Sequence, residues 1–392
     1  MTIINMQMSK KYTLLAAIVA ATTLSSCFKE QPLGNECDIE AAYIHTDNPG
    51  ELFLQPTDSI VNVTSVQQKV NLSVLKGTDL THMAPLFRLT PGATISPANG
   101  SEHDFSQGPV TYTVTSEDGA YKRAYEVSVD YYPVTVSNFD FEGCSLYTNT
   151  NGKKWYVWND YDASEEPNWA SGNAGFSIAR GSAKPEEYPT TPLENGYEGK
   201  GVMLRTCDTG GFGAMVNMRI AAGNLFTGVF DSKKATSSPM AATHFGEGVK
   251  NKIYNRPLRF SGYYQYTPGE TFQDKQGNAV AGRVDQGDIY AVVYKNTDDN
   301  GAAFYLTGDN VLTSPQIVLL ARVPSVTKTD DGWSFFDIPF DPKGTFDHAT
   351  LAAGGYNMAV VFTSSIEGAA FEGAIGSTLL IDKVRVVYND KD

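Results

Sequence analysis

The sequence predicts an all-β protein that folds as two β-sandwiches, the second larger than the first. Short runs that alternate polar and apolar residues recur along most of the 392-residue chain, as in half-buried antiparallel strands. The 36 glycines, 21 tyrosines and 20 phenylalanines are typical of loop-rich β structure, and long apolar stripes at helical spacing are absent. Long connections rich in Gly, Asp and Asn between the later strands favour a jelly roll in the second sandwich.

The first residues predict export from the cell. Lys10 and Lys11 precede a compact apolar run, residues 12–24, which has the length of a signal-peptide core and is too short to span a membrane. The run ends in Leu-Ser-Ser-Cys, which resembles the bacterial lipobox and implies lipidation of Cys27; an ordinary signal peptide is the alternative. We therefore expect a lipoprotein signal peptide over residues 1–26 and a lipidated tether over 27–36.

Charge and cysteine usage limit the partners. The net charge of −14 becomes −16 once the two lysines of residues 1–26 are removed, and an exported acidic chain repels nucleic acid. No later stretch reaches the ~18 apolar residues of a membrane span, so we expect membrane contact through the lipid anchor only. Cys37, Cys144 and Cys207 are too few for a disulfide framework and lie in no zinc-type cluster.

The first sandwich is expected over residues 37–132. Alternating runs at residues 59–63, 69–74, 86–89 and 110–115 precede a tight turn at Asp118-Gly119 and a return strand. The segment TYTVTSEDGAYKRAYEVSV resembles the last hairpin of the immunoglobulin-like modules of Bacteroidetes surface lipoproteins. The resemblance implies a spacer, with glycan binding as the alternative. Pro133 marks the boundary, because proline cannot donate to a strand ladder.

The second sandwich is expected over residues 133–392 and closes on the end of the chain. The stretch Gly373–Tyr388 begins with a glycine turn and continues as an alternating strand. Its best partner is the distant run Val134–Glu142. If the two strands pair antiparallel, they bring both ends of the domain together. Six further strands are read between them, around residues 201–206, 258–266, 288–294, 315–322, 333–340 and 356–362.

Several segments of this second region carry a family resemblance. NFDFE, AAGNLFTGVF, RPLRFSGYYQYTPG, GDIYAVVY and YNMAVVFTSSIEGAAFEGAIGSTLLIDKVRVVY occur in order. Together they resemble the "putative carbohydrate metabolism domain" of Bacteroidetes lipoproteins. The resemblance implies a jelly-roll sandwich similar to carbohydrate-binding modules, a role in glycan use, and no agreed catalytic residues. The whole chain then reads as an immunoglobulin-like sandwich followed by a jelly-roll domain.

A tryptophan-rich segment is the candidate glycan site. Trp155, Trp158 and Trp169 lie within fifteen residues, with Asn159 and Asp160 beside them. Sugar C–H faces stack on indole rings, and sugar hydroxyl groups bond to Asn and Asp side chains. The alternative is that these large rings fill the sandwich interior. The exposure of the tryptophans decides between the two.

Other chemistry is less well marked. Asp140 or Glu142, together with Asp382, would supply oxygen ligands for a structural calcium ion if the end strands pair; no other cofactor is required. For glycoside hydrolysis, which needs two carboxylates across a cleft, the least arbitrary candidates are at positions 285, 288, 367 and 372. The sequence nominates no catalytic residue, and we expect a binding protein rather than an enzyme.

The resulting hypothesis is an outer-membrane lipoprotein that faces the cell exterior. Its jelly-roll domain would bind glycan or polysaccharide and support its capture or use. A glycoside hydrolase that acts through a carboxylate pair is one alternative. A structural or adhesin-like subunit of a surface complex is another, for which buried tryptophans and an exposed apolar patch would be the sign.

Overall fold

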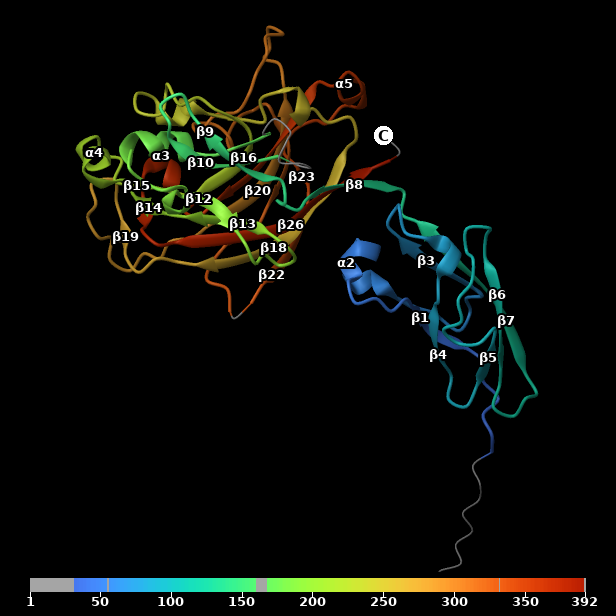
Figure 1. Ribbon diagram of the computed structural model, residues 1–392. Coiled ribbons are helices and arrows are strands. Elements are labelled where there is room, and N and C mark those ends of the chain that lie inside the picture. Colours follow the sequence, from blue (N-terminus) through green and yellow to red (C-terminus); the bar gives the residue numbers. More distant parts are fainter. Residues whose placement is uncertain (1–31, 55, 160–167, 331, 391–392) are drawn as a thin grey trace, which may run out of the picture. The chain divides into compact units, whose positions relative to one another are not determined.

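The computed structural model describes residues 32–54, 56–159, 168–330 and 332–390 (Figure 1). It is 41% strand and 12% helix, which confirms the predicted β-rich class. The chain divides into two compact units, the first ending at Tyr132 and the second beginning at Pro133. Within the described residues, no helix has both the length and the apolar character needed to cross a membrane. The signal peptide and Cys27 lie outside the described residues.

The first unit contains a three-stranded and a four-stranded sheet. The three-stranded sheet has the order β2 (Ile60–Asn62), β1 (Ile39–Tyr43), β4 (Leu86–Leu89). The four-stranded sheet has the order β3 (Lys69–Val74), β7 (Lys122–Tyr131), β6 (Val110–Thr115), β5 (Thr94–Ser96), and β3 runs parallel to β7. Alternate side chains such as Leu72, Tyr112 and Val127 point into one core. The β6–β7 hairpin turns at Gly119, whose φ of 72° suits glycine.

A six-stranded sheet forms one layer of the second unit (Figure 1). Its order is β12 (Thr190–Leu193), β13 (Gly201–Arg205), β26 (Thr378–Asn389), β18 (Pro257–Thr267), β22 (Ser334–Pro339), with β8 (Val134–Phe139) also paired to β26. All of these pairs are antiparallel. The long strand β26 lies at the centre of the sheet.

A seven-stranded antiparallel sheet forms the other layer. Its order is β11 (Trp169–Ala170), β16 (Asn224–Phe230), β24 (Tyr356–Thr363), β20 (Asp288–Lys295), β21 (Ile317–Arg322), β23 (Asp341–Pro342), with β17 (Thr243–Phe245) paired to β16. Strands β20 and β24 are buried on both faces, which explains their nearly continuous apolar sequences. The core between the two sheets combines Phe260 and Ile381 from the six-stranded sheet with Ile289 and Phe362 from the seven-stranded one.

Shorter elements complete this unit. Three two-stranded ribbons pair β9 (Cys144–Thr148) with β10 (Lys154–Trp158), β14 (Cys207–Asp208) with β15 (Ile220–Ala221), and β19 (Phe272–Gln273) with β25 (Gly373–Ala374). Among its described residues this unit also has the α-helices α3 (Asn173–Ala179), α4 (Gly210–Met215) and α5 (His348–Ala352); the first unit contains α2 (Pro49–Leu52). The described cysteines Cys37, Cys144 and Cys207 are free thiols.

The predicted pairing of the end strands is confirmed. Val384 lies opposite Phe139 and Asn389 opposite Val134 in an antiparallel ladder. A bulge interrupts β26 where it pairs with β18, and Lys383 has a φ of 48° there. Because of the extra residue, the inward-facing positions change from odd to even numbers, from Ile381 to Val384.

Candidate functional site

The three tryptophans of the predicted glycan platform are buried. Trp155, Trp158 and Trp169 are 7%, 1% and 4% exposed. Trp169 meets Phe139 edge-on, with ring centroids 5.4 Å apart, and stacks on Phe362 at 6.0 Å. These rings contact protein and offer no free face to a sugar, so the expectation of an exposed platform is wrong for them. Their role in this structure is the core packing that the sequence left open as the alternative.

The polar residues of that segment do not provide an exposed glycan site either. Asn159 is 3% exposed and lies beneath Gly143, whose carbonyl oxygen accepts its backbone N–H at 3.0 Å. Asp160 lies outside the described residues. Trp155 belongs to a small cluster with Phe176 and Tyr188, apart from the main core. The segment therefore closes over the sandwich instead of presenting side chains to solvent.

The predicted calcium ligands have other partners. The Asp382 carboxylate is fully buried and accepts backbone N–H groups of Glu198 at 3.0 Å and Lys383 at 2.7 Å. The Glu142 carboxylate accepts the Lys200 N–H at 2.8 Å, and that of Asp140 accepts the Glu142 N–H at 3.3 Å. Over the described ranges, no group of three or more His, Cys, Asp or Glu residues could hold a metal ion. The structural calcium ion stays a prediction.

These carboxylates hold a loop in place. Residues 194–200 connect β12 to β13, and Asp382 from the closing strand and Glu142 from the beginning of the unit both bind N–H groups of this loop. Burial raises the pKa of Asp382 to about 6, despite the N–H donors that favour its charged form. The loop carries Tyr197, which is thereby fixed above the six-stranded sheet.

A partly exposed aromatic cluster results, which we call the aromatic surface: Tyr197, Tyr263, Trp333 and Phe335. The rings of Tyr197 and Tyr263 stack with centroids 3.7 Å apart and planes 10° apart. Trp333 meets Tyr197 edge-on at 6.1 Å, and Phe335 lies 5.0 Å from Tyr263. Tyr197 is 47% exposed and Phe335 is 41% exposed. Cross-strand pairing places Tyr263 opposite Phe335, so both side chains share the outer face of the sheet.

Charged pairs border the aromatic surface. Arg259 donates from Nε to Asp337 at 2.7 Å. The two residues lie on β18 and β22, the strands that carry Tyr263 and Phe335. Lys383 and Glu198 form an ion pair at 3.6 Å beside Tyr197. Burial raises the pKa of Tyr263 to about 12, so its phenol is neutral at physiological pH. Neutral rings with hydrogen-bonding groups at the margin are suited to a ligand that has both apolar faces and hydroxyl groups.

The four acids considered for hydrolysis all form hydrogen bonds or ion pairs with other groups of the protein. Asp285 is 1% exposed and accepts three hydrogen bonds on one oxygen, from Ser365, Ser377 and the Ala374 N–H. Asp288 is held by both Nε and Nη2 of its neighbour Arg322, at 2.9 and 2.8 Å.

The other two candidates share one arginine. Glu367 and Glu372 both pair with Arg283. A pair of carboxylates facing each other across a cleft is therefore not formed by these four acids.

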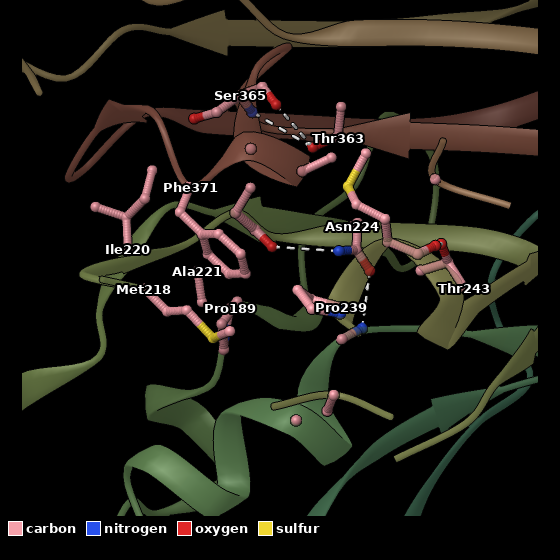
Figure 2. A pocket seen from close by; sticks show the side chains of 18 of the residues that line it. Pro189, Met218, Ile220, Ala221, Asn224, Pro239, Thr243, Thr363, Ser365 and Phe371 are labelled. Carbon is pink, nitrogen blue, oxygen red and sulfur yellow. Dashed lines mark hydrogen bonds between the residues drawn. The ribbon is translucent and has the colours of Figure 1, made fainter. Parts of the chain in front are cut away.

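A separate pocket lies on the outer face of the seven-stranded sheet (Figure 2). Its volume is about 350 Å³, and most of its wall is apolar. The wall side chains labelled in Figure 2 come from several elements: Pro189, Met218, Ile220, Ala221, Asn224, Pro239, Thr243, Thr363, Ser365 and Phe371. Asn224 is held by the Gly172 N–H, which donates to its side-chain oxygen at 2.8 Å. Neither the pocket nor the aromatic surface includes any of the predicted glycan-binding residues.

Comparison with known families identifies the larger unit. Residues 140–387 match the model of the family described as "Putative carbohydrate metabolism domain", or PCMD. The chain belongs to the PCMD family. The resemblance read from the sequence is thereby confirmed. Within the first unit, residues 53–129 match the model "SGBP, N-terminal", in which SGBP denotes a surface glycan-binding protein. No curated protein matches the chain.

Two solved structures resemble this PCMD protein over most of their length. One is a putative glycoside hydrolase from Bacteroides thetaiotaomicron, 38% identical, with 92% of this chain and 98% of that chain covered and a TM-score of 0.58. The other is a putative glycoside hydrolase from Bacteroides vulgatus, 34% identical, with 63% of this chain and 96% of that chain covered and a TM-score of 0.57.

Sequence reasoning missed the aromatic surface because its members are far apart in the chain. Positions 197 and 263 are brought together by a loop and a strand that the sequence does not place side by side. A partial signal was present, since Tyr263 and Phe335 each occupy a polar-side position in an alternating strand. An aromatic residue at a position expected to face solvent is a better sign of a binding surface than a local excess of tryptophan.

Proposed function

We propose that this PCMD protein binds glycan at the cell surface through the aromatic surface of its larger unit. The observation that carries the proposal is the stack of Tyr197 on Tyr263, flanked by Trp333 and Phe335, on the outer face of the six-stranded sheet. The apolar C–H face of a sugar ring packs on an aromatic ring, and its hydroxyl groups reach the charged pairs at the margin. The PCMD and SGBP matches support this class of ligand.

The domain arrangement proposed from the sequence fits this role. We infer a jelly roll for the larger unit, supported by its two packed antiparallel sheets. For the first unit we infer an immunoglobulin-like spacer, supported by its two small sheets around one core. Lipidation at Cys27 would anchor the chain to the outer membrane, with the binding face toward the exterior. Replacement of Cys27 by alanine should then release the protein from the membrane fraction and abolish labelling by radioactive palmitate.

The proposal is tested by removing two rings of the aromatic surface. In the double variant Trp333→Ala with Phe335→Ala, binding to the best ligand on a glycan array should weaken by at least about tenfold, because each ring contact contributes of the order of 1 kcal/mol. Tyr254→Ala is the matched control, since Tyr254 is 60% exposed and packs beside Gly354 instead of in this cluster. Equal affinity of the double variant and the control would refute the site.

Glycoside hydrolysis is the second candidate function, because both solved relatives carry that description. Two acids at the margin of the aromatic surface are Glu198, next to Tyr197, and Asp337, two residues after Phe335. Release of reducing sugar from a bound polysaccharide, abolished by Glu198→Gln or Asp337→Asn, would establish hydrolysis. Binding without release would favour capture alone.

A structural or adhesin-like role is the remaining alternative. Its expected sign was buried tryptophans combined with an exposed apolar patch. Three tryptophans are buried here, and the aromatic surface is bordered by ion pairs, which suits a sugar better than a protein partner.

A further inference from the structure

The pocket on the seven-stranded sheet is a second concave feature, on the opposite layer from the aromatic surface. At about 350 Å³ it lies within the usual range for small-molecule sites. Its floor consists of side chains on the outer face of the sheet, including Phe226, Tyr290 and Val361. Nothing in the proposed glycan-binding role uses it.

We propose that this pocket binds a neutral, mainly apolar small molecule, about the size of two fused rings, whose single hydroxyl or carbonyl group bonds to the Tyr290 hydroxyl. The size follows from the volume, because a cavity of roughly 150 Å³ is enough to hold benzene. A polysaccharide chain would not fit, since its many hydroxyl groups would be left without partners against this wall.

The Tyr290 hydroxyl is the polar group that is available to bond to a ligand. Tyr290 is 96% buried, lines the pocket, and makes no hydrogen bond with the described residues. Its cross-strand neighbour Arg322 is directed to both oxygens of Asp288 instead. Burial raises the pKa of Tyr290 above its usual range, so the phenol keeps its proton. The Tyr290 hydroxyl is not among the sealed, unpaired polar atoms of the described residues, so it faces the open space of the pocket, where a ligand oxygen can pair with it.

Several other polar wall groups already have partners. Thr209 donates to the Met218 carbonyl oxygen at 2.6 Å, and Ser365 donates to Asp285 at 2.6 Å. Thr243 donates to the Met240 carbonyl oxygen at 3.2 Å. Thr236 and Thr313 are exposed to solvent at the margin, so Tyr290 is the principal anchor within the pocket.

The charge of the wall favours a neutral ligand. The described residues of the lining include no Lys, Arg or His that could hold an anion. The buried acid Asp288 is already neutralised by Arg322, so a cation gains little from it. Asp309 lies exposed to solvent, where its charge is screened.

The rim of the pocket is also apolar. The lining side chains Ile178, Phe212, Val216 and Ile366 are each between 38% and 46% exposed. Phe212 belongs to the glycine-rich helix α4, and Val216 follows it. Exposed apolar side chains around a concave site are typical of a ligand-binding entrance.

The experiment uses 2-naphthol as a neutral two-ring probe and naphthalene-2-sulfonate as its anionic counterpart, titrated into the purified protein by calorimetry. Saturable 2-naphthol binding is expected, with the sulfonate at least about tenfold weaker. Tyr290→Phe keeps the ring and removes the hydroxyl, and should weaken 2-naphthol binding about five- to tenfold. No saturable binding of 2-naphthol, or equal affinity for the sulfonate, would overturn the proposal.

A blocking variant separates this pocket from other sites. Ala369 is exposed and lines the pocket, whereas its neighbour Ala370 is exposed and does not. Ala369→Trp should abolish 2-naphthol binding, and Ala370→Trp should leave it unchanged. Equal loss in both variants, or in neither, would place the probe elsewhere and sink the assignment. Glycan binding should be unaffected by Ala369→Trp, which distinguishes failure of this inference from failure of the proposed function.

Discussion

The ring centroids of Tyr197 and Tyr263 lie 3.7 Å apart, with the two ring planes 10° apart. Tyr197 comes from the β12–β13 loop and Tyr263 from β18. Asp382, on the closing strand, accepts an N–H of this loop, and so does Glu142 near the start of the unit. The two ends of the domain thus determine where an exposed aromatic side chain lies.

The first prediction concerns Tyr197 itself. Tyr197→Ala should weaken glycan binding by about three- to tenfold, because the ring supplies a stacking face, while the free energy of unfolding should fall by less than about 1 kcal/mol, because the ring is 47% exposed. Calorimetry measures the first quantity. Urea unfolding followed by tryptophan fluorescence measures the second for the larger unit alone, since all four tryptophans are in it. A variant with native affinity would exclude Tyr197 from the site.

The second prediction is a weak dependence of glycan binding on salt and pH. The pKa of Tyr263 is raised to about 12 by burial, so its phenol stays protonated from pH 6 to 9. The affinity for a neutral glycan should therefore change less than about twofold between 50 and 500 mM NaCl and between pH 6 and 9. A steep loss of affinity with salt would indicate that the charged pairs, and not the rings, provide most of the binding.

The third prediction concerns Asp382 and the pH dependence of stability. Its folded-state pKa of about 6 lies above the usual aspartate value of 3.8, so between about pH 4 and 6 the folded protein binds more protons than the unfolded chain. The free energy of unfolding should therefore decrease as the pH rises through this window. At 1.36 kcal/mol per pKa unit, the decrease is about 3 kcal/mol, complete above about pH 7.

Asp382→Asn isolates this contribution. Asparagine retains one oxygen acceptor for the loop and does not titrate, so the other carboxyl groups contribute equally to both proteins. The difference between the wild-type and variant free energies of unfolding, measured in urea from pH 4 to 8, should fall with rising pH. Parallel profiles would show that Asp382 ionises in the folded protein as it does in the unfolded chain.

Much of the larger unit could be predicted from sequence because its strands carry strong local patterns. The alternation after Asp382 indicated a half-buried strand, and the end of the chain paired with Val134–Phe139 as expected. The bulge at Lys383 could not be read, since it depends on the partner strand.

The site was predicted poorly for a related reason. Trp169 is adjacent to polar and small residues in sequence, yet long-range strand pairing places it against Phe139, Phe141 and Phe362. Local composition does not reveal burial of this kind. The exposed rings that replace it as candidates are separated by up to 138 positions, from Tyr197 to Phe335, and only the folded sheet gathers them.

The fourth prediction tests the packing of the loop. A Cβ atom at Gly196 would lie 2.6 Å from an Asp382 oxygen and 2.9 Å from the Lys200 backbone, so Gly196→Ala must displace the loop. We expect a loss of about 1–3 kcal/mol in stability and weaker glycan binding, because Tyr197 moves with the loop. Gly211→Ala is the control, since no atom lies within 4 Å of a Cβ there. Native glycan affinity in Gly196→Ala would show that the position of the loop does not affect glycan binding.

The last prediction distinguishes a structural acid from a catalytic one. Asp285 accepts hydrogen bonds from Ser365, Ser377 and the Ala374 N–H in a fully buried position. Asp285→Ala leaves these donors unsatisfied and should lower the free energy of unfolding by about 3–5 kcal/mol. Asp330→Ala, at an exposed acid of the same unit, should change it by less than about 0.5 kcal/mol. Urea unfolding by tryptophan fluorescence measures both. A folded, fully stable Asp285→Ala variant that loses a hydrolytic activity would overturn the structural assignment and indicate that Asp285 is catalytic.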